Sequence, residues 1–133
     1  MTGETDLKKL LAAVTPELLP DIYVFVTLQP DAPVPDTLNP LMIFREKEGT
    51  TLILREDEAD GLQAAFRCRM ITLSIHSSLE AVGFLAAITT RLTKAGMGVN
   101  PVSAFYHDHL FVPADRAEEA MELLRQLARD SAG

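Results

Sequence analysis

An internal repeat is the feature that most constrains the fold of this chain of 133 residues. Residues 52–59 read LILREDEA and residues 110–117 read LFVPADRA, so a leucine, an aspartate and an alanine recur at matching places. The same offset aligns two further pairs of strand-like segments, residues 41–46 with 99–104 and residues 22–28 with 70–76. The repeat therefore predicts two related units, which we place at residues 1–65 and 66–133. It also predicts that each unit has its own sheet, with the strands of the last pair in equivalent places.

The second half of the chain carries the clearer signals. Residues 70–76 (MITLSIH) alternate like a half-buried strand, and residues 77–80 (SSLE) have the spacing of a capping box at a helix start. We predict a helix from this box to about residue 95, ended by Gly96 and Gly98, since glycine adopts the left-handed conformation common at helix ends. The remaining pattern predicts strands at residues 99–105 and 110–112 and an amphipathic helix at residues 114–128.

The first half lacks one of these elements. Residues 29–40 (QPDAPVPDTLNP) hold four prolines, which exclude a helix or a central strand and predict a loop. Residues 5–14 have leucines at helical spacing after the possible caps Thr5 and Asp6. We expect this N-terminal helix to cover the sheet face that the proline-rich loop leaves open. The remaining segments predict strands at residues 22–28, 41–45 and 50–54, a turn at 46–49, and at most a short helix at 56–62.

Composition excludes several classes of partner. The net charge of −7 argues against nucleic acid and anionic membranes, because phosphates attract clustered Lys and Arg. The single cysteine, Cys68, permits no disulfide within the chain and is expected to be a buried small hydrophobe. The N-terminal sequence lacks the pattern of a signal peptide, and no apolar run is long enough for a membrane span. These observations predict a cytoplasmic protein.

The second half resembles the ACT domain, a small ferredoxin-like regulatory module that binds amino acids. The resemblance rests on the β-α-β-β-α order, on SSLEAVG at the first helix, and on AGMGVN where that helix ends and the next strand starts. HSSLEAVG together with YHDHLFVP also resembles a bacterial family of small stand-alone proteins with two ACT-like units. The resemblance implies an α+β fold with two ferredoxin-like β-α-β-β-α units packed side by side, the first lacking its first crossover helix. It further implies a non-enzymatic regulatory protein that binds an amino acid and forms a homodimer.

In ACT domains the ligand lies near the turn between the first strand and first helix, which implies a site mainly in the second predicted unit, residues 66–133. The residues implied are Ser77, Ser78, Leu79, Glu80, Ala81, Val82, Gly83 and, on the following strand, Asn100. Free amides and the positive end of the helix dipole at this turn suit a carboxylate, and Gly83 permits a close approach. Alternative interpretations stay open: the serines and Glu80 form only a helix cap, Gly83 serves only packing, and Asn100 is only a polar strand start.

The sequence YHDH at residues 106–109 has three interpretations. His107 and His109 point to the same face of a strand, so they could supply two zinc ligands or contact a ligand. Asp108 favours a turn, and we predict a hairpin without a metal, and well under one zinc per chain after purification without added metal. No nucleophile elbow, phosphate-binding glycine loop or cysteine metal motif is present, so we predict no cofactor and no enzyme activity. The alternative functions are an oligomerisation or protein-interaction module without a ligand and a metal-dependent enzyme.

Overall fold

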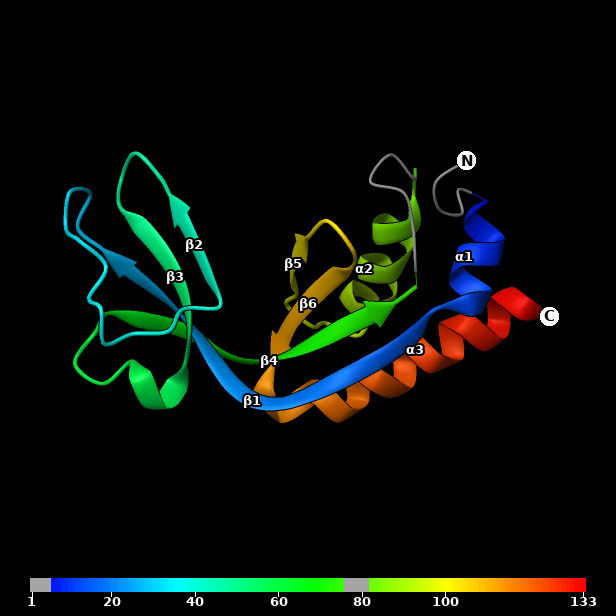
Figure 1. Ribbon diagram of the computed structural model, residues 1–133. Helices are drawn as coiled ribbons and strands as arrows, with labels where there is room; N and C mark the ends of the chain where they lie inside the picture. The colour runs from blue at the N-terminus through cyan, green and yellow to red at the C-terminus, as the bar shows by residue number, and fades with distance from the viewer. Residues whose placement is uncertain (1–5, 76–81) are drawn as a thin grey trace. The chain divides into compact units, whose positions relative to one another are not determined.

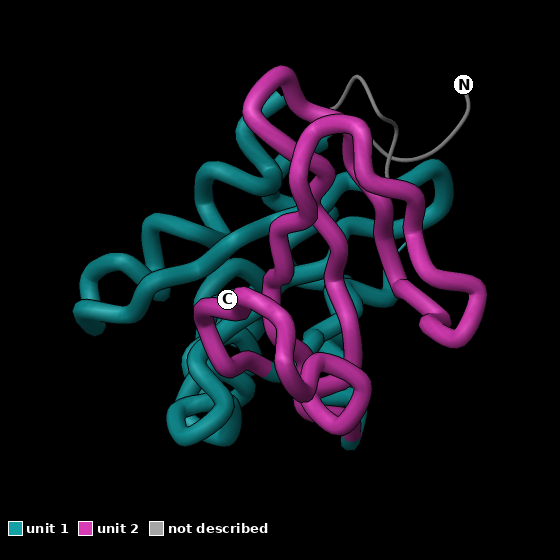
Figure 2. The backbone as a smooth tube through the Cα atoms, turned by 90° about the vertical axis from the view of Figure 1, so that its left-hand side faces the viewer, with its two compact units in different colours: residues 1–20, 69–133 teal, residues 21–68 magenta. Residues whose placement is uncertain are grey.

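The computed structural model describes residues 6–75 and 82–133, which form two compact units (Figure 2). Unit 1 comprises residues 1–20 and 69–133, and unit 2 comprises residues 21–68. The elements in chain order are α1 (Leu7–Ala13), β1 (Thr15–Leu28), β2 (Met42–Arg45), β3 (Thr50–Arg55), the 3₁₀ helix η1 (Glu56–Glu58), β4 (Ala64–Ser74), α2 (Phe84–Lys94), β5 (Asn100–Ser103), β6 (Asp108–Pro113), the 3₁₀ helix η2 (Ala114–Arg116) and α3 (Ala117–Ala132). The division of the sequence at residue 65 remains a prediction.

The strand order confirms the repeat inferred from the sequence. The strands are hydrogen-bonded in the order β2-β3-β1-β4-β6-β5, so β1, β2 and β3 correspond to β4, β5 and β6. Strands β2 and β3 form an antiparallel hairpin, as β5 and β6 do. The fold is therefore α+β with a tandem ferredoxin-like arrangement. The expectation of a separate sheet for each unit is wrong, because the six strands belong to one sheet.

The three α-helices all belong to unit 1 and share one core with its strands (Figure 1). Alternate residues of β4 and β6 face this core, namely Ile71, Leu73, Leu110 and Val112. The helices contribute a larger set of apolar side chains: Leu10, Leu11, Phe84, Ile88, Leu92, Ala117, Ala120, Met121, Leu124 and Leu127. The predicted N-terminal helix exists, but the expectation that it covers the first repeat is wrong. Helix α1 packs on α3 instead.

In unit 2 a loop covers part of the core that the missing crossover helix would otherwise cover. Residues 29–41 contain no helix, which confirms that the first repeat lacks its crossover helix. Val34 and Leu38 of this loop pack on the buried cluster of unit 2. That cluster consists of Val24, Val26, Leu52, Leu54 and Ala59. Two apolar side chains on a proline-constrained loop thus cover part of a surface that a helix would otherwise bury.

The two helix starts differ in their agreement with the sequence. Asp6 caps α1, its Oδ1 accepting a hydrogen bond from the backbone N–H of Lys9 at 3.3 Å. The predicted capping box at residues 77–80 lies outside the described residues. A helix begun there would include Val82 and Gly83, whereas α2 begins only at Phe84 and Gly83 has a φ of +86°. The predicted start is therefore too early, because a left-handed residue cannot continue an α-helix.

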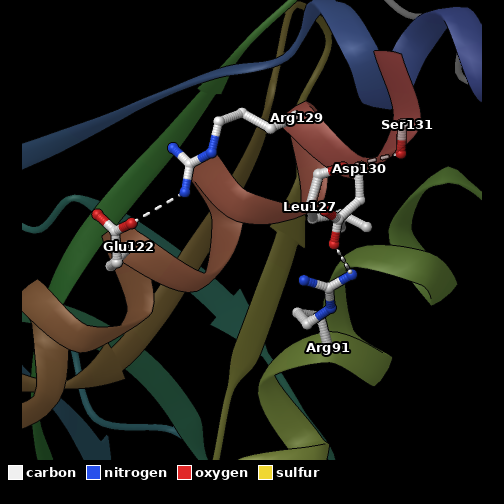
Figure 3. Close-up of polar contacts among 6 residues, drawn as sticks. All are labelled: Arg91, Glu122, Leu127, Arg129, Asp130 and Ser131. Carbon is white, nitrogen blue, oxygen red and sulfur yellow. Dashed lines mark hydrogen bonds and ion pairs between the residues drawn. The ribbon is translucent and has the colours of Figure 1, made fainter. Parts of the chain in front are cut away.

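Exposed ion pairs lie on the surface of α2 and α3 (Figure 3). Arg91 of α2 donates to Asp130 of α3 at 3.2 Å, and Arg129 donates to Glu122 at 3.1 Å. The Ser131 hydroxyl donates to the carbonyl of Leu127. Exposed pairs of this kind contribute about 0–1 kcal/mol each, so the apolar core rather than these contacts holds the helices together.

Candidate functional site

The turn before α2 is the site that the sequence implies, and the structure describes part of it. Ser77, Ser78, Leu79, Glu80 and Ala81 lie outside the described residues. Val82 is 84% exposed, and Gly83 has the left-handed backbone noted above. Gly83 offers no side-chain cap, and the first intrahelical bond from this end runs from the N–H of Ala87 to the carbonyl of Gly83 at 3.0 Å. The amides of the first turn, before Ala87, have no carbonyl within α2 to bond to and point toward the N-terminal end of the helix.

Asn100 is not brought next to this turn. It starts β5, pairs with Phe111 of β6, and is exposed. Helix α2 lies between Gly83 and the segment leading to Asn100, and its 11 residues extend over about 16 Å. The chain thus reaches β5 from the end of the helix opposite to the turn (Figure 1). Within one chain, Gly83 and Asn100 therefore lie toward opposite ends of α2.

The segment YHDH forms the predicted hairpin. Strands β5 and β6 pair antiparallel, with Ser103 opposite Asp108, and the N–H of Ala104 donates to the carbonyl of His107 at 3.0 Å. The hydroxyl of Ser103 also donates to a carboxylate oxygen of Asp108. The hairpin interpretation of this segment is confirmed.

The two histidines lie on one face, as their spacing predicts. Their rings are nearly parallel, with an interplanar angle of 15° and centroids 6.4 Å apart. Leu110 and Val112 belong to the core shared with the helices, so His109 lies on the face of the sheet turned away from the helices. Within the described parts of the chain, no group of three or more His, Cys, Asp and Glu side chains is arranged to hold a metal ion.

His109 has a defined hydrogen-bond partner on the neighbouring strand. Its Nδ1 lies 3.0 Å from the hydroxyl of Thr72 in β4. Burial lowers the pKa of His109, the nearby His107 lowers it further, and Asp108 acts in the opposite direction. At neutral pH the ring is therefore uncharged, and it can act as a hydrogen-bond donor or acceptor rather than as a cation.

The sequence motifs single out no site residues within unit 2 (residues 21–68), but the structure has a polar cavity there. Its volume is about 340 Å³, and six residues line it: Asp21, Tyr23, Asn39, Pro40, Leu41 and Arg55. A second, more apolar cavity of about 270 Å³ lies beside Phe25 and Gln63. These lining residues come from separate segments of the sequence, and no local motif announces them.

The tandem ferredoxin-like arrangement places this protein among small two-unit α+β domains. ACT-domain family models match residues 2–69 and residues 65–126. The chain belongs to the ACT domain family, which confirms the resemblance seen in the sequence. ACT domains are regulatory modules that bind small molecules, and this protein is a two-unit member of that class.

Solved structures show the same fold. A protein of unknown function from Vibrio cholerae, described as a possible transport protein, is 38% identical over 93% of this chain and 97% of its own, with a TM-score of 0.84. A protein from Agrobacterium tumefaciens is 18% identical over 86% of this chain and 89% of its own, with a TM-score of 0.76. The regulatory subunit of aspartate kinase from Thermus flavus is 15% identical over 86% of this chain and 98% of its own, with a TM-score of 0.67.

Among proteins of curated function, none is significantly similar in sequence to this chain. No helix within residues 6–75 and 82–133 combines the length and apolarity needed to cross a membrane.

Proposed function

We propose that this protein is a non-enzymatic regulator that binds an amino acid at the turn before α2. The observation that carries the proposal is the match of both halves of the chain to a family of regulatory small-molecule-binding domains. The similarity in fold to a regulatory subunit of aspartate kinase adds a precedent for this fold in a separate regulatory subunit. By this analogy the amino acid would act as an effector.

The start of α2 supports the location of the site. The proposed site is the stretch of residues 77–83, of which the structure describes Val82 and the left-handed Gly83, and the first amides of α2 follow. A carboxylate there would accept hydrogen bonds from these amides and interact favourably with the helix dipole. Asn100 is assigned no direct contact in this proposal, because the chain connects it to the far end of α2.

Cellular setting and assembly form part of the same proposal. The acidic net charge of −7 and the lone buried Cys68 suit a reducing cytoplasm without nucleic-acid or membrane partners. We expect a homodimer, and sedimentation equilibrium at several protein concentrations measures it directly. A monomer at all concentrations would contradict this part of the proposal.

A thermal-shift screen with the twenty standard amino acids tests the binding function. A ligand that binds only the folded state stabilises it by about 2.7 kcal/mol at a hundredfold excess over Kd. We expect one or a few amino acids to raise Tm in a concentration-dependent manner. If none does so at millimolar concentration, the protein is not an amino-acid-binding regulator.

Val82 provides a test of the location that preserves the fold. The exposed side chain precedes α2, where Val82→Asp adds a carboxylate that itself favours the helix N-terminus. A charge about 4 Å from the ligand carboxylate in water costs about 1 kcal/mol, so affinity should fall about fivefold at low salt. Val82→Asn is the matched neutral control. Equal affinity of the two variants for the amino acid found in the screen would place binding elsewhere.

A further inference from the structure

The polar cavity of unit 2 combines opposite charges on one surface. Tyr23 pairs directly with Arg55 across β1 and β3, so their side chains lie on the same face of the sheet. Asp21 precedes Tyr23 by two residues in the same strand and therefore shares this face. The third side of the cavity is the segment Asn39, Pro40 and Leu41.

The surroundings of Tyr23 agree with this placement. Burial raises the pKa of the Tyr23 hydroxyl, the carboxylate of Asp21 raises it further, and the guanidinium of Arg55 lowers it. The phenol thus lies within electrostatic reach of both charges. A carboxylate and a guanidinium at the edge of one small cavity match a ligand that carries an ammonium and a carboxylate.

Arg55 lies near two carboxylates, but these contacts do not use up its hydrogen-bonding capacity. Its Nε lies 3.5 Å from both Asp57 and Glu58, farther than the roughly 2.7–2.9 Å of a charge-assisted hydrogen bond. Arg55 therefore retains capacity for a further carboxylate, which its planar guanidinium can bind through two parallel hydrogen bonds.

Glu58 connects the two walls of the cavity. Its side chain is 14% exposed, and its Oε1 accepts a hydrogen bond from the backbone N–H of Asn39 at 2.8 Å. Its Oε2 is buried, faces Arg55, and has no hydrogen-bond partner among the described residues. One carboxylate thereby bonds the loop residue and lies within ion-pair distance of the arginine, so it links the two walls of the cavity before a ligand arrives.

We propose that this cavity, lined by Asp21, Tyr23, Asn39 and Arg55, is a second ligand site that binds a small zwitterion of the α-amino-acid class. Asp21 accepts the ammonium group, and Arg55 donates to the carboxylate. Tyr23 and Asn39 supply the remaining polar contacts, and Leu41 contacts the side chain of the ligand. This site is separate from the turn before α2 and belongs to the repeat that lacks the crossover helix.

Amide chemical shifts of the full chain test the proposal residue by residue. The twenty standard amino acids are titrated to millimolar concentration, and any amino acid that binds is compared with its N-acetyl and amide derivatives. We expect saturable shifts at Tyr23, Asn39 and Arg55, and affinity about tenfold lower for each derivative, because each lacks one of the two charges. Saturable shifts confined to residues 82–87 would overturn this second site while supporting the proposed function. No saturable shift anywhere would overturn both.

Paired variants separate recognition from general charge effects. Asp21→Asn should weaken binding about tenfold, the lower value for a bond to a charged group, because Asp21 is solvent-exposed. It should cause no further loss for the N-acetyl derivative, which has no ammonium group to lose. Asp60→Asn, elsewhere in unit 2, is the matched control. Arg55→Lys keeps the charge but loses the paired hydrogen bonds, with Arg67→Lys as its control. Unchanged affinity in Asp21→Asn and Arg55→Lys would contradict the assignment.

Discussion

Replacement of Gly83 by alanine is the sharpest test of how α2 begins. If Gly83 lay inside a helix begun at the capping box, alanine would stabilise the protein by about 1 kcal/mol through helix propensity. In the structure Gly83 has a φ of +86°, and an added Cβ would lie 3.4 Å from Cδ2 of Leu7. An L-residue in the left-handed region costs about 1–2 kcal/mol, so Gly83→Ala should instead destabilise unit 1 by about this amount. The two interpretations therefore predict changes of opposite sign in the free energy of unfolding of Gly83→Ala.

Two other glycines near the end of α2 provide matched controls. Gly96 has a φ of +72° and open space around its Cβ position, so Gly96→Ala measures the conformational cost alone. Gly98 has open space and no positive φ, so Gly98→Ala should be neutral or stabilising by up to about 1 kcal/mol. The difference between Gly83→Ala and Gly96→Ala then measures the contact with Leu7.

Urea denaturation followed by circular dichroism gives the free energies of unfolding, and thermal melting gives an independent measure. For a chain of this length, 1 kcal/mol corresponds to about 3–5 °C in Tm. We expect Tm to fall for Gly83→Ala and Gly96→Ala and to stay level or rise for Gly98→Ala. A Gly83→Ala protein as stable as wild type, beside a destabilised Gly96→Ala protein, would refute the left-handed start of α2.

Three further predictions concern other parts of the chain. Gly49→Ala should destabilise the β2–β3 hairpin by about 1–3 kcal/mol, because the new Cβ would lie 2.6 Å from the carbonyl oxygen of Leu28; a wild-type urea midpoint would contradict the packing. Cys68 is fully buried, and burial raises its thiol pKa to about 12, so a thiol reagent at pH 8 should label it only in denaturant; rapid labelling of the folded protein would contradict this. In NMR titrations the imidazole of His109 should show a pKa below 6.5. This pKa should rise in His107→Gln, because the substitution removes a neighbour that lowers it. The unfolded state binds this proton more readily, so the contribution of His109 to the free energy of unfolding is complete above pH 6.5 and is lost as pH falls from 6.5 toward the folded pKa. If the free energy of unfolding instead rises on acidification through this range in the wild type but not in His109→Gln, the sign of this effect is wrong.

Local signals in the sequence determined most of the elements. The alternation in residues 70–76, of which 70–74 lie in β4, predicts a strand that the structure contains, and so do the proline-rich residues 29–40 for a loop, residues 46–49 for a turn and the amphipathic pattern after residue 114 for a helix. These signals succeed because a strand, a turn or a helical face depends on neighbours within a few residues. The internal repeat extended this local information to the equivalence of the two sets of strands and to the missing crossover helix.

Tertiary structure decided where the elements pack and which residues meet. Helix α1 has an apolar stripe that suits any partner, and only the completed core assigns it to α3 rather than to the first repeat. The SSLE motif has the spacing of a cap, but the left-handed Gly83 resets the start of α2 to Phe84. The separation of Gly83 from Asn100 is also a tertiary property, because it depends on the direction in which α2 traverses the unit. The polar cavity required Asp21, Asn39 and Arg55 to converge from three segments. The pairing of β1 with β3 places Asp21 and Arg55 on one face, because sheet register rather than sequence distance sets which side chains are neighbours, and the hydrogen bond from the Asn39 backbone N–H to Glu58 ties the loop to the segment after β3.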